Sequence, residues 1–241
     1  GRTVLVGAAG AVLLAVFGLV ESRHESPLVP PAFATRKSVL VPNAAISLQS
    51  MVGIAWLYVL TLYFQEVLGH GPFDTGLLFA PMTLAAVVAA PIGGRLATRF
   101  GLRATAVLGL TLVGAGLVAM VAGMSPTGSL TVVLGGMVVG EAGFMLSNVS
   151  LTAAGTVHGA EDGGGLAAGL LNTSTQLGNG WGLAIAAVVV ASAHPGGGRP
   201  GAGGYADALR LGLGACLCFC ALAVVVVLLG LRRHPAATAP T

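Results

Sequence analysis

The 241-residue chain is 55% hydrophobic and only 8% charged, and its mean hydropathy is +0.91. Soluble domains carry about 25% charged residues, so this composition excludes an ordinary soluble domain. The net charge of +3 comes with no clustered basic face, which argues against a nucleic-acid-binding surface. The 38 glycines stand within Leu, Val and Ala runs, as in closely packed membrane helices. The scarcity of lysine beside arginine suggests a GC-rich bacterial genome.

Seven segments are long and apolar enough, or nearly so, to cross a bilayer, which takes about 20 residues. Each has to be helical, because an open sheet would leave backbone amides unpaired in lipid. We therefore expect an all-α integral membrane protein with a bundle of these helices. The segments are 3–20, 43–63, 76–94, 104–122, 130–150, 166–193 and 209–231.

Basic residues are distributed unevenly over the predicted loops. Eight of the eleven Lys and Arg fall at one end of the predicted bundle, and three of these lie in the tight loop that follows the span 76–94. Because Lys and Arg are enriched in cytoplasmic loops, we expect an external N-terminus and a cytoplasmic C-terminus. Four prolines disfavour a continuous helix in 21–42, which we expect to lie along the cytoplasmic face as a linker.

The residues of this tight loop resemble a family motif. The run Gly94-Arg95-Leu96-Ala97-Thr98-Arg99-Phe100-Gly101-Leu102-Arg103 resembles the cytoplasmic motif G-x-L-a-D-R-x-G-x-R/K of the major facilitator superfamily. The upstream run 62–65 (LYFQ) and the downstream run 165–178 resemble the 14-helix drug:proton antiporter branch. The resemblance covers nearly the whole chain, as the last seven of fourteen helices. The chain departs from the motif at Thr98, where the family has an acid that pairs with an arginine.

The resemblance implies the C-terminal half of such an antiporter in a bacterial plasma membrane. Residues 1–20 would be the linker helix of this branch, 21–42 the cytoplasmic linker, 43–231 the six-helix bundle and 232–241 the cytoplasmic tail. The implied function is proton-coupled efflux of drug-like or amphipathic small molecules by alternating access. The proton gradient would take the place of a cofactor, and the N-terminal half of the transporter would be the missing partner. The cytoplasmic gating loop would contain Gly94, Arg95, Arg99, Gly101 and Arg103.

Two other functions fit a membrane bundle of this kind. One is an uptake carrier of the facilitator type, which would move its substrate in the opposite direction. The other is a non-transporting membrane fragment or scaffold. The direction of flux in vesicles with a pH gradient distinguishes the carriers, and an upstream reading frame with further spans argues against the fragment.

One ionisable residue lies in the middle of a predicted span. Glu141 stands within 130–150, between Gly140 and the pair Ala142-Gly143. A charge at the bilayer centre costs about 2.5–3.5 kcal/mol on insertion scales, so this side chain should face the bundle interior or an aqueous cavity. Glu141 is our candidate for a proton-coupling carboxylate or a counter-ion of a cationic substrate. A polar packing role is the alternative.

Polar and aromatic residues in two other spans are candidates for lining a substrate cavity. Gln49, Trp56 and Tyr63 are seven residues apart, so they share one face of the span 43–63. Asn172 and Gln176 belong to a polar turn near the start of 166–193, where helix–helix hydrogen bonding is the alternative role. Packing for Trp56 and interfacial anchoring for Tyr63 are also open.

Catalytic and metal-binding signatures are missing from the sequence. It contains no phosphate-binding loop, no zinc-protease motif and no hydrolase nucleophile motif, so we expect no enzyme activity. His158, Glu161 and Asp162 are too few and too closely spaced for a metal site. We interpret Cys216, Cys218 and Cys220 as small apolar residues.

Overall fold

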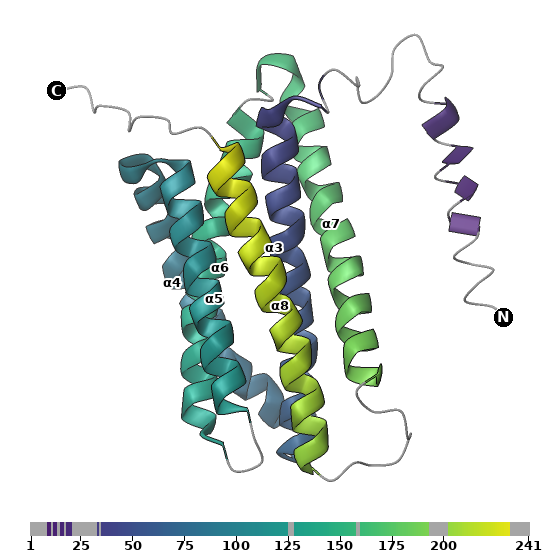
Figure 1. Ribbon diagram of the computed structural model, residues 1–241. Coiled ribbons are helices and arrows are strands. Elements are labelled where there is room, and N and C mark those ends of the chain that lie inside the picture. Colours follow the sequence, from purple (N-terminus) through teal and green to yellow (C-terminus); the bar gives the residue numbers. More distant parts are fainter. Residues whose placement is uncertain are drawn as a thin grey trace.

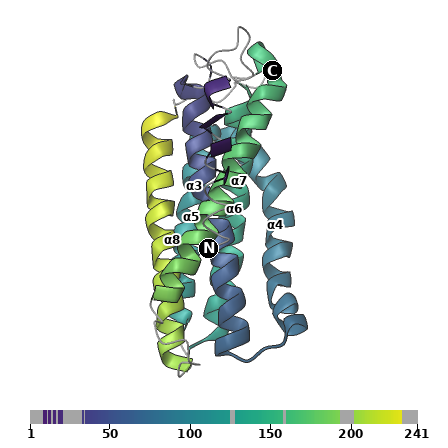
Figure 2. The same cartoon turned by 90° about the vertical axis from the view of Figure 1, so that its right-hand side faces the viewer.

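The computed structural model describes residues 35–124, 128–157, 160–192 and 202–231, together with Phe33 and several positions between 9 and 20. The regular structure of these residues is helical, and the long helices run up and down side by side (Figure 1, Figure 2). The expectation of an all-α bundle is confirmed. In chain order the elements are α3 (Lys37–Leu62), the π-helix η1 (Tyr63–Val67), α4 (Pro72–Phe100), α5 (Leu102–Gly123), α6 (Leu130–Val157), α7 (Ala160–Ser192) and α8 (Ala202–Gly230).

Five of the predicted crossings are helices that are long and apolar enough to span a bilayer. They are Lys37–Val67, Pro72–Phe100, Leu102–Gly123, Leu130–Thr156 and Gly204–Gly230. The predicted crossing 166–193 forms most of α7, which packs along α3 but is more polar in its first half (Figure 1). Half of the predicted crossing 3–20 lies outside the described residues, and its described positions are helical.

Two predicted boundaries are wrong in the same direction, because helices continue into segments that we expected to be loops. α3 begins at Lys37 and includes Pro42, which we had placed in the linker. Pro42 lies in the second turn, where its missing N–H removes one backbone bond without ending the helix. α4 continues to Phe100 and α5 begins at Leu102, so Gly101 alone connects them. Its φ of 87° is a conformation that glycine adopts without strain.

Glycines bring α5 and α6 into backbone contact. A Cβ on Gly116 would lie 2.6 Å from the Cα of Gly140, and a Cβ on Gly143 would lie 2.5 Å from the carbonyl oxygen of Gly109. Close approach of this kind strengthens helix association in lipid, where no hydrophobic force drives it. Gly136 and Gly140, predicted as a packing pair, are therefore confirmed as packing residues.

The other two predicted glycine pairs differ from each other. Gly178 and Gly182 of α7 lie against the backbone of Ser47 and Met51 on α3, so this pair is also confirmed. Gly165 and Gly169 have open space where a Cβ would be. The packing prediction is wrong for that pair.

Side-chain hydrogen bonds join α5 to α8 along the length of both helices. Arg103 Nη2 donates to the Leu228 carbonyl at 2.6 Å, and Arg210 Nε donates to the Val121 carbonyl at 3.0 Å. Between them, Cys220 Sγ lies 3.1 Å from the Leu110 carbonyl oxygen. Cys216 is buried and Cys218 is exposed, so the three cysteines serve as packing or surface residues of α8.

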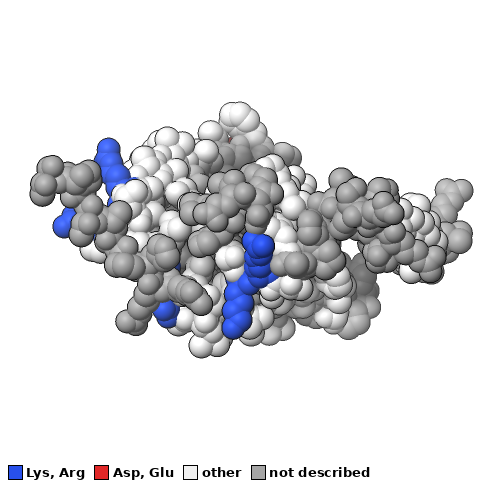
Figure 3. All heavy atoms as spheres, turned by 90° about the horizontal axis from the view of Figure 1, so that it is seen from above, with Lys and Arg blue, Asp and Glu red and all other residues white. Residues whose placement is uncertain are grey.

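Apart from Glu141, the described charged residues lie at the two ends of the bundle, and most of the basic ones lie at one end. The start of α3, the end of α4 and the start of α5 meet at one end, seen from above in Figure 3. This end carries the basic residues Arg36, Lys37, Arg95, Arg99 and Arg103. The opposite end carries the acids Glu66, Asp74 and Asp207, and Arg210 pairs there with Asp207 at 3.4 Å. The charge asymmetry expected of an oriented membrane protein is thus present in three dimensions.

Candidate functional site

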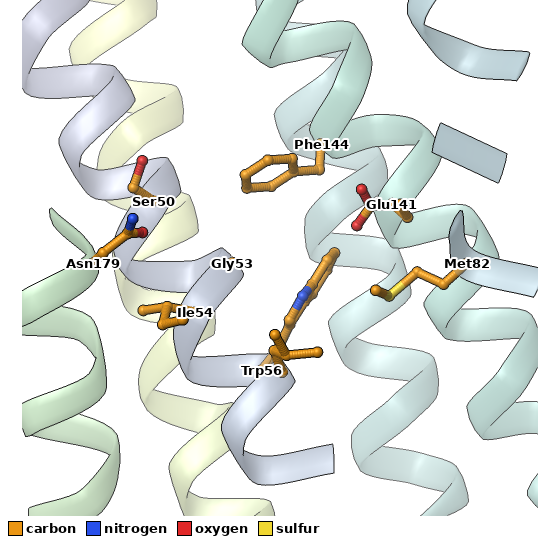
Figure 4. Close-up of a pocket in the computed structure, with 9 residues that line it drawn as sticks. Ser50, Gly53, Ile54, Trp56, Met82, Glu141, Phe144 and Asn179 are labelled. Carbon is orange, nitrogen blue, oxygen red and sulfur yellow. The ribbon is translucent and has the colours of Figure 1, made fainter. Parts of the chain in front are cut away.

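A pocket of about 240 Å³ lies about halfway along the helices, where α3 and α6 meet between α4 and α7. Ligand pockets usually measure about 300–1,000 Å³, so this one is small, and it is partly open. Figure 4 shows the side chains around it. Its lining residues are Ser50, Gly53, Ile54, Trp56 and Leu57 of α3, Met82 of α4, Glu141 and Phe144 of α6, and Asn179 of α7.

Glu141 supplies the pocket's only ionisable side chain. It lies near the middle of α6, and its carboxylate points toward the space between Trp56 and Phe144 (Figure 4). No hydrogen bond or ion pair joins Glu141 to another side chain among the described residues, and no basic residue lines the pocket. The carboxylate is therefore available to a proton or to a cationic group of a ligand.

Two aromatic rings form the wall beside Glu141. The Trp56 and Phe144 rings lie 6.0 Å apart at a tilt of 41°, one from α3 and the other from α6. Each ring rests on a glycine of the facing helix. A Cβ on Gly140 would lie 2.8 Å from Trp56, and a Cβ on Gly53 would lie 2.7 Å from Phe144. Aromatic faces beside a carboxylate suit a flat or cationic organic molecule.

Of the predicted cavity residues, only Trp56 lines the pocket together with Glu141. Gln49 is 1% exposed and lies outside the lining, and its Nε2 donates to the Phe144 carbonyl at 2.8 Å. Tyr63 is also 1% exposed, in η1, with its ring 5.8 Å from the Phe64 ring. All three side chains are buried, and Gln49 and Tyr63 pack in the interior without lining the pocket.

The two α7 candidates lie on the surface. Asn172 and Gln176 are exposed, and Gln176 Oε1 accepts a hydrogen bond from Asn179 Nδ2 at 3.2 Å. Their neighbour Ser174 donates to Asn43 Oδ1 of α3 at 2.7 Å. The polar turn therefore makes one helix–helix hydrogen bond and reaches the pocket only through Asn179.

The pocket includes residues that we did not predict, above all Asn179, Phe144 and Met82. Asn179 lies three residues after the predicted Gln176, about one turn further along α7. Phe144 lies three residues after Glu141 and so on the same helix face. This spacing could have identified Phe144 once Glu141 was chosen.

The predicted gating loop is helical apart from Gly101, so its description as a loop is wrong. Arg95 and Arg99 are exposed on the last turns of α4, and the Arg99 guanidinium lies 5.2 Å from the centroid of the Phe100 ring. The Thr98 hydroxyl donates to the Arg95 carbonyl at 2.9 Å, a bond within one helix. Arg103 donates its hydrogen bond to the Leu228 carbonyl near the end of α8. His158 and the side chains of Glu161 and Asp162 lie outside the described residues.

The long apolar helices, with charged residues gathered at their two ends and one carboxylate in a mainly apolar pocket at mid-depth, define a multi-pass membrane protein. The chain belongs to the major facilitator superfamily, whose family model matches residues 2–183.

Several bacterial proteins are similar to this chain. It is 30% identical over 200 residues to the tetracenomycin C resistance and export protein of Streptomyces glaucescens, covering 79% of this chain and 35% of that protein. It is 32% identical over 193 residues to the lincomycin resistance protein of Streptomyces lincolnensis, covering 78% and 39%. It is 25% identical over 191 residues to the multidrug resistance protein Stp of Mycobacterium tuberculosis, covering 79% and 35%. The chain thus spans little more than a third of the length of these relatives.

Proposed function

We propose that this chain is the C-terminal helical bundle of a proton-coupled exporter of drug-like or amphipathic small molecules. The observation that carries the proposal is Glu141, an unpaired carboxylate at mid-depth in a pocket walled by Trp56 and Phe144. Membership of the major facilitator superfamily and similarity to proteins named for drug resistance and export support it. No cofactor or enzymatic step is part of this mechanism.

The exchange mechanism follows from the chemistry of one carboxylate. When Glu141 is ionised, the pocket attracts a cation, and the aromatic rings bind its apolar part. When Glu141 is protonated, that attraction is lost, so a proton and a cationic substrate compete for the same group. Binding on one side of the membrane and release on the other then exchanges substrate for proton.

The N-terminal part of the transporter is the proposed partner. Transporters of this class rock two helical bundles about a site at their interface. The size of the pocket fits half a site, and α4 and α7 beside it present exposed apolar side chains such as Leu84, Val88 and Trp181. A second bundle laid across this face would enlarge and enclose the pocket.

The proposed orientation places the Lys37–Arg103 end in the cytoplasm. Arg36, Lys37, Arg95, Arg99 and Arg103 all lie at that end, which agrees with the positive-inside rule. It places Thr98, near the end of α4, on the cytoplasmic side of the membrane. We propose that the helix ends around Gly101 contribute to gating there, with an ion pair missing because Thr98 replaces an acid.

The test is transport by the full reading frame that contains this chain. Inside-out membrane vesicles are given an acidic lumen, and uptake of the lipophilic cation tetraphenylphosphonium is measured. An exporter takes up the cation as protons leave, and an uncoupler abolishes the uptake. Expulsion of the cation under the same gradient would indicate an uptake carrier. No gradient-dependent flux would indicate a fragment or scaffold, and either result would contradict the proposal.

A further inference from the structure

Gln49 makes an interhelical hydrogen bond beside the pocket without lining it. The side chain is 1% exposed on α3, one helical turn before Gly53. Its Nε2 donates to the Phe144 carbonyl oxygen of α6 at 2.8 Å. The Ser147 hydroxyl lies 3.1 Å from the same oxygen, so two side chains converge on one backbone carbonyl. The Phe144 carbonyl therefore links α3 and α6, the two helices that form the pocket wall.

The other half of the Gln49 amide is unsatisfied. Within the described part of the chain, Oε1 is buried and has no hydrogen-bond partner. Reversing the amide would bring Oε1 against the Phe144 carbonyl, a contact between two acceptors, so the bond itself fixes the orientation of the amide. A buried acceptor without a partner is destabilising, and an apolar residue of similar shape would avoid that cost. Stability alone therefore does not explain a glutamine at this position.

The hydrogen bond acts on the part of α6 that carries the carboxylate. Glu141 and Phe144 are three residues apart and share a helix face. The Phe144 ring rests on Gly53, and the Trp56 ring rests on Gly140, the residue before Glu141. Holding the Phe144 carbonyl thus sets how this turn of α6 lies against α3, and with it the direction of the Glu141 side chain.

We propose that Gln49 is a positioning residue that presents Glu141 to the ligand by fixing the α6 turn 141–144 against α3. It acts through the Phe144 backbone and does not itself touch the ligand. The ligand-binding part of this inference rests on the proposed function, whereas the geometric part does not.

The experiment uses Trp56 as a reporter of the pocket wall. The protein has two tryptophans, so Trp181→Phe leaves Trp56 as the single emitter. Trp181 is 64% exposed on α7, so this change should leave the pocket intact. In this background we compare Gln49→Leu, Gln49→Glu and the control Gln65→Leu, which lies in η1 outside the pocket. Trp56 emission, acrylamide quenching and thermal unfolding are measured on the purified chain. Binding of tetraphenylphosphonium is measured on the full reading frame that contains the chain, with Trp181 unchanged.

Gln49→Leu removes the hydrogen bond together with the unsatisfied oxygen. We expect it to shift Trp56 emission and raise its quenching while thermal stability is kept or raised. Tetraphenylphosphonium should bind about tenfold or more weakly, because a misplaced binding group loses affinity without unfolding the protein. Gln65→Leu should match the parent in every measurement.

Gln49→Glu provides a rescue that depends on pH. A protonated carboxyl group can donate to the Phe144 carbonyl, whereas an ionised one has no donor and repels it. All variants are compared with the parent at the same pH. The Trp56 emission and quenching of Gln49→Glu should equal those of the parent at low pH, and those of Gln49→Leu at high pH. A packing role for Gln49 predicts no such reversal.

Two results would overturn the inference. One is parent-like Trp56 emission and quenching in Gln49→Leu. The other is a spectral change that occurs only together with a loss of thermal stability, without rescue in Gln49→Glu. If the parent binds no tetraphenylphosphonium but the Trp56 changes and the rescue occur, the positioning inference is supported and the proposed function fails.

Discussion

The Phe144 ring of α6 occupies the space that a side chain on Gly53 of α3 would fill. A Cβ on Gly53 would lie 2.7 Å from the ring atom Cε2. The Trp56 ring of α3 occupies the equivalent space at Gly140 of α6. Each helix thus packs one aromatic ring on a glycine of the other helix, and the pocket with Glu141 lies beside these two contacts.

This packing of rings on glycines predicts that a side chain at Gly53 destabilises the protein. We expect Gly53→Ala to displace the Phe144 ring, change Trp56 fluorescence and lower the free energy of unfolding by about 1–3 kcal/mol, as for other overpacked sites. Gly135→Ala on α6 is the matched control, since nothing lies within 4 Å of its Cβ position. It should be neutral or stabilising. Unfolding in mixed detergent micelles measures both, and equal stability of the two variants would contradict the close packing.

The contact between α5 and α6 predicts a larger effect at Gly116. There a Cβ would lie 2.6 Å from the Cα of Gly140, and backbone cannot rotate away as a ring can. Gly116→Ala should therefore force the helices apart and cost at least about 3 kcal/mol of unfolding free energy, the upper range for overpacking. Gly214→Ala on α8 has open space and serves as the control. Similar unfolding curves for the two variants would show that these helices are not in backbone contact.

The sequence predicts the helices well because lipid leaves few alternatives for an apolar segment. It also predicts that Glu141 faces a cavity, because a charge in lipid is costly, and it predicts two of the three glycine packing pairs. It does not predict which way each helix is turned. The helices are apolar on all sides, so no polar stripe marks the face toward the pocket.

Gln49 and Tyr63 illustrate this limit. Their seven-residue spacing groups them with Trp56, and all three side chains are buried. Sequence periodicity does not distinguish a cavity from a packed interface. Packing against α6 placed Gln49 on the Phe144 carbonyl. Likewise, nothing in the arginine-rich run at the α4–α5 junction indicates that helix continues up to Gly101. A single positive-φ residue there replaces the expected loop.

Arg103 should contribute to stability, unlike the nearby Arg95. Its guanidinium bonds the Leu228 carbonyl in the last turn of α8, where backbone acceptors lack helical partners. Arg103→Ala should lower the free energy of unfolding by about 1.5–3 kcal/mol, the value of a hydrogen bond to a charged group. Arg95→Ala, at an exposed site, should change it by less than about 0.5 kcal/mol. Thermal unfolding compares them, and a loss of equal size in both variants would argue against a specific role for Arg103.

The orientation is open to a labelling experiment. In a background with Cys216, Cys218 and Cys220 replaced by alanine, single cysteines are introduced by Lys37→Cys or Asp74→Cys. A maleimide that does not cross membranes should label the Asp74→Cys protein on intact cells and the Lys37→Cys protein only after the membrane is opened. The reverse pattern would place the basic end outside and contradict the proposed sidedness.

The central claim is that Glu141 couples substrate to protons. The most direct measurement is tetraphenylphosphonium uptake driven by an acidic lumen in inside-out vesicles, comparing the full reading frame with its Glu141→Gln and Glu66→Gln variants. Glu66 is exposed in η1, so Glu66→Gln should transport normally. Glu141→Gln should lose gradient-driven uptake by about 100-fold or more, the size expected when a proton-transfer group is removed. Gradient-driven uptake at the parental rate in Glu141→Gln would contradict the claim.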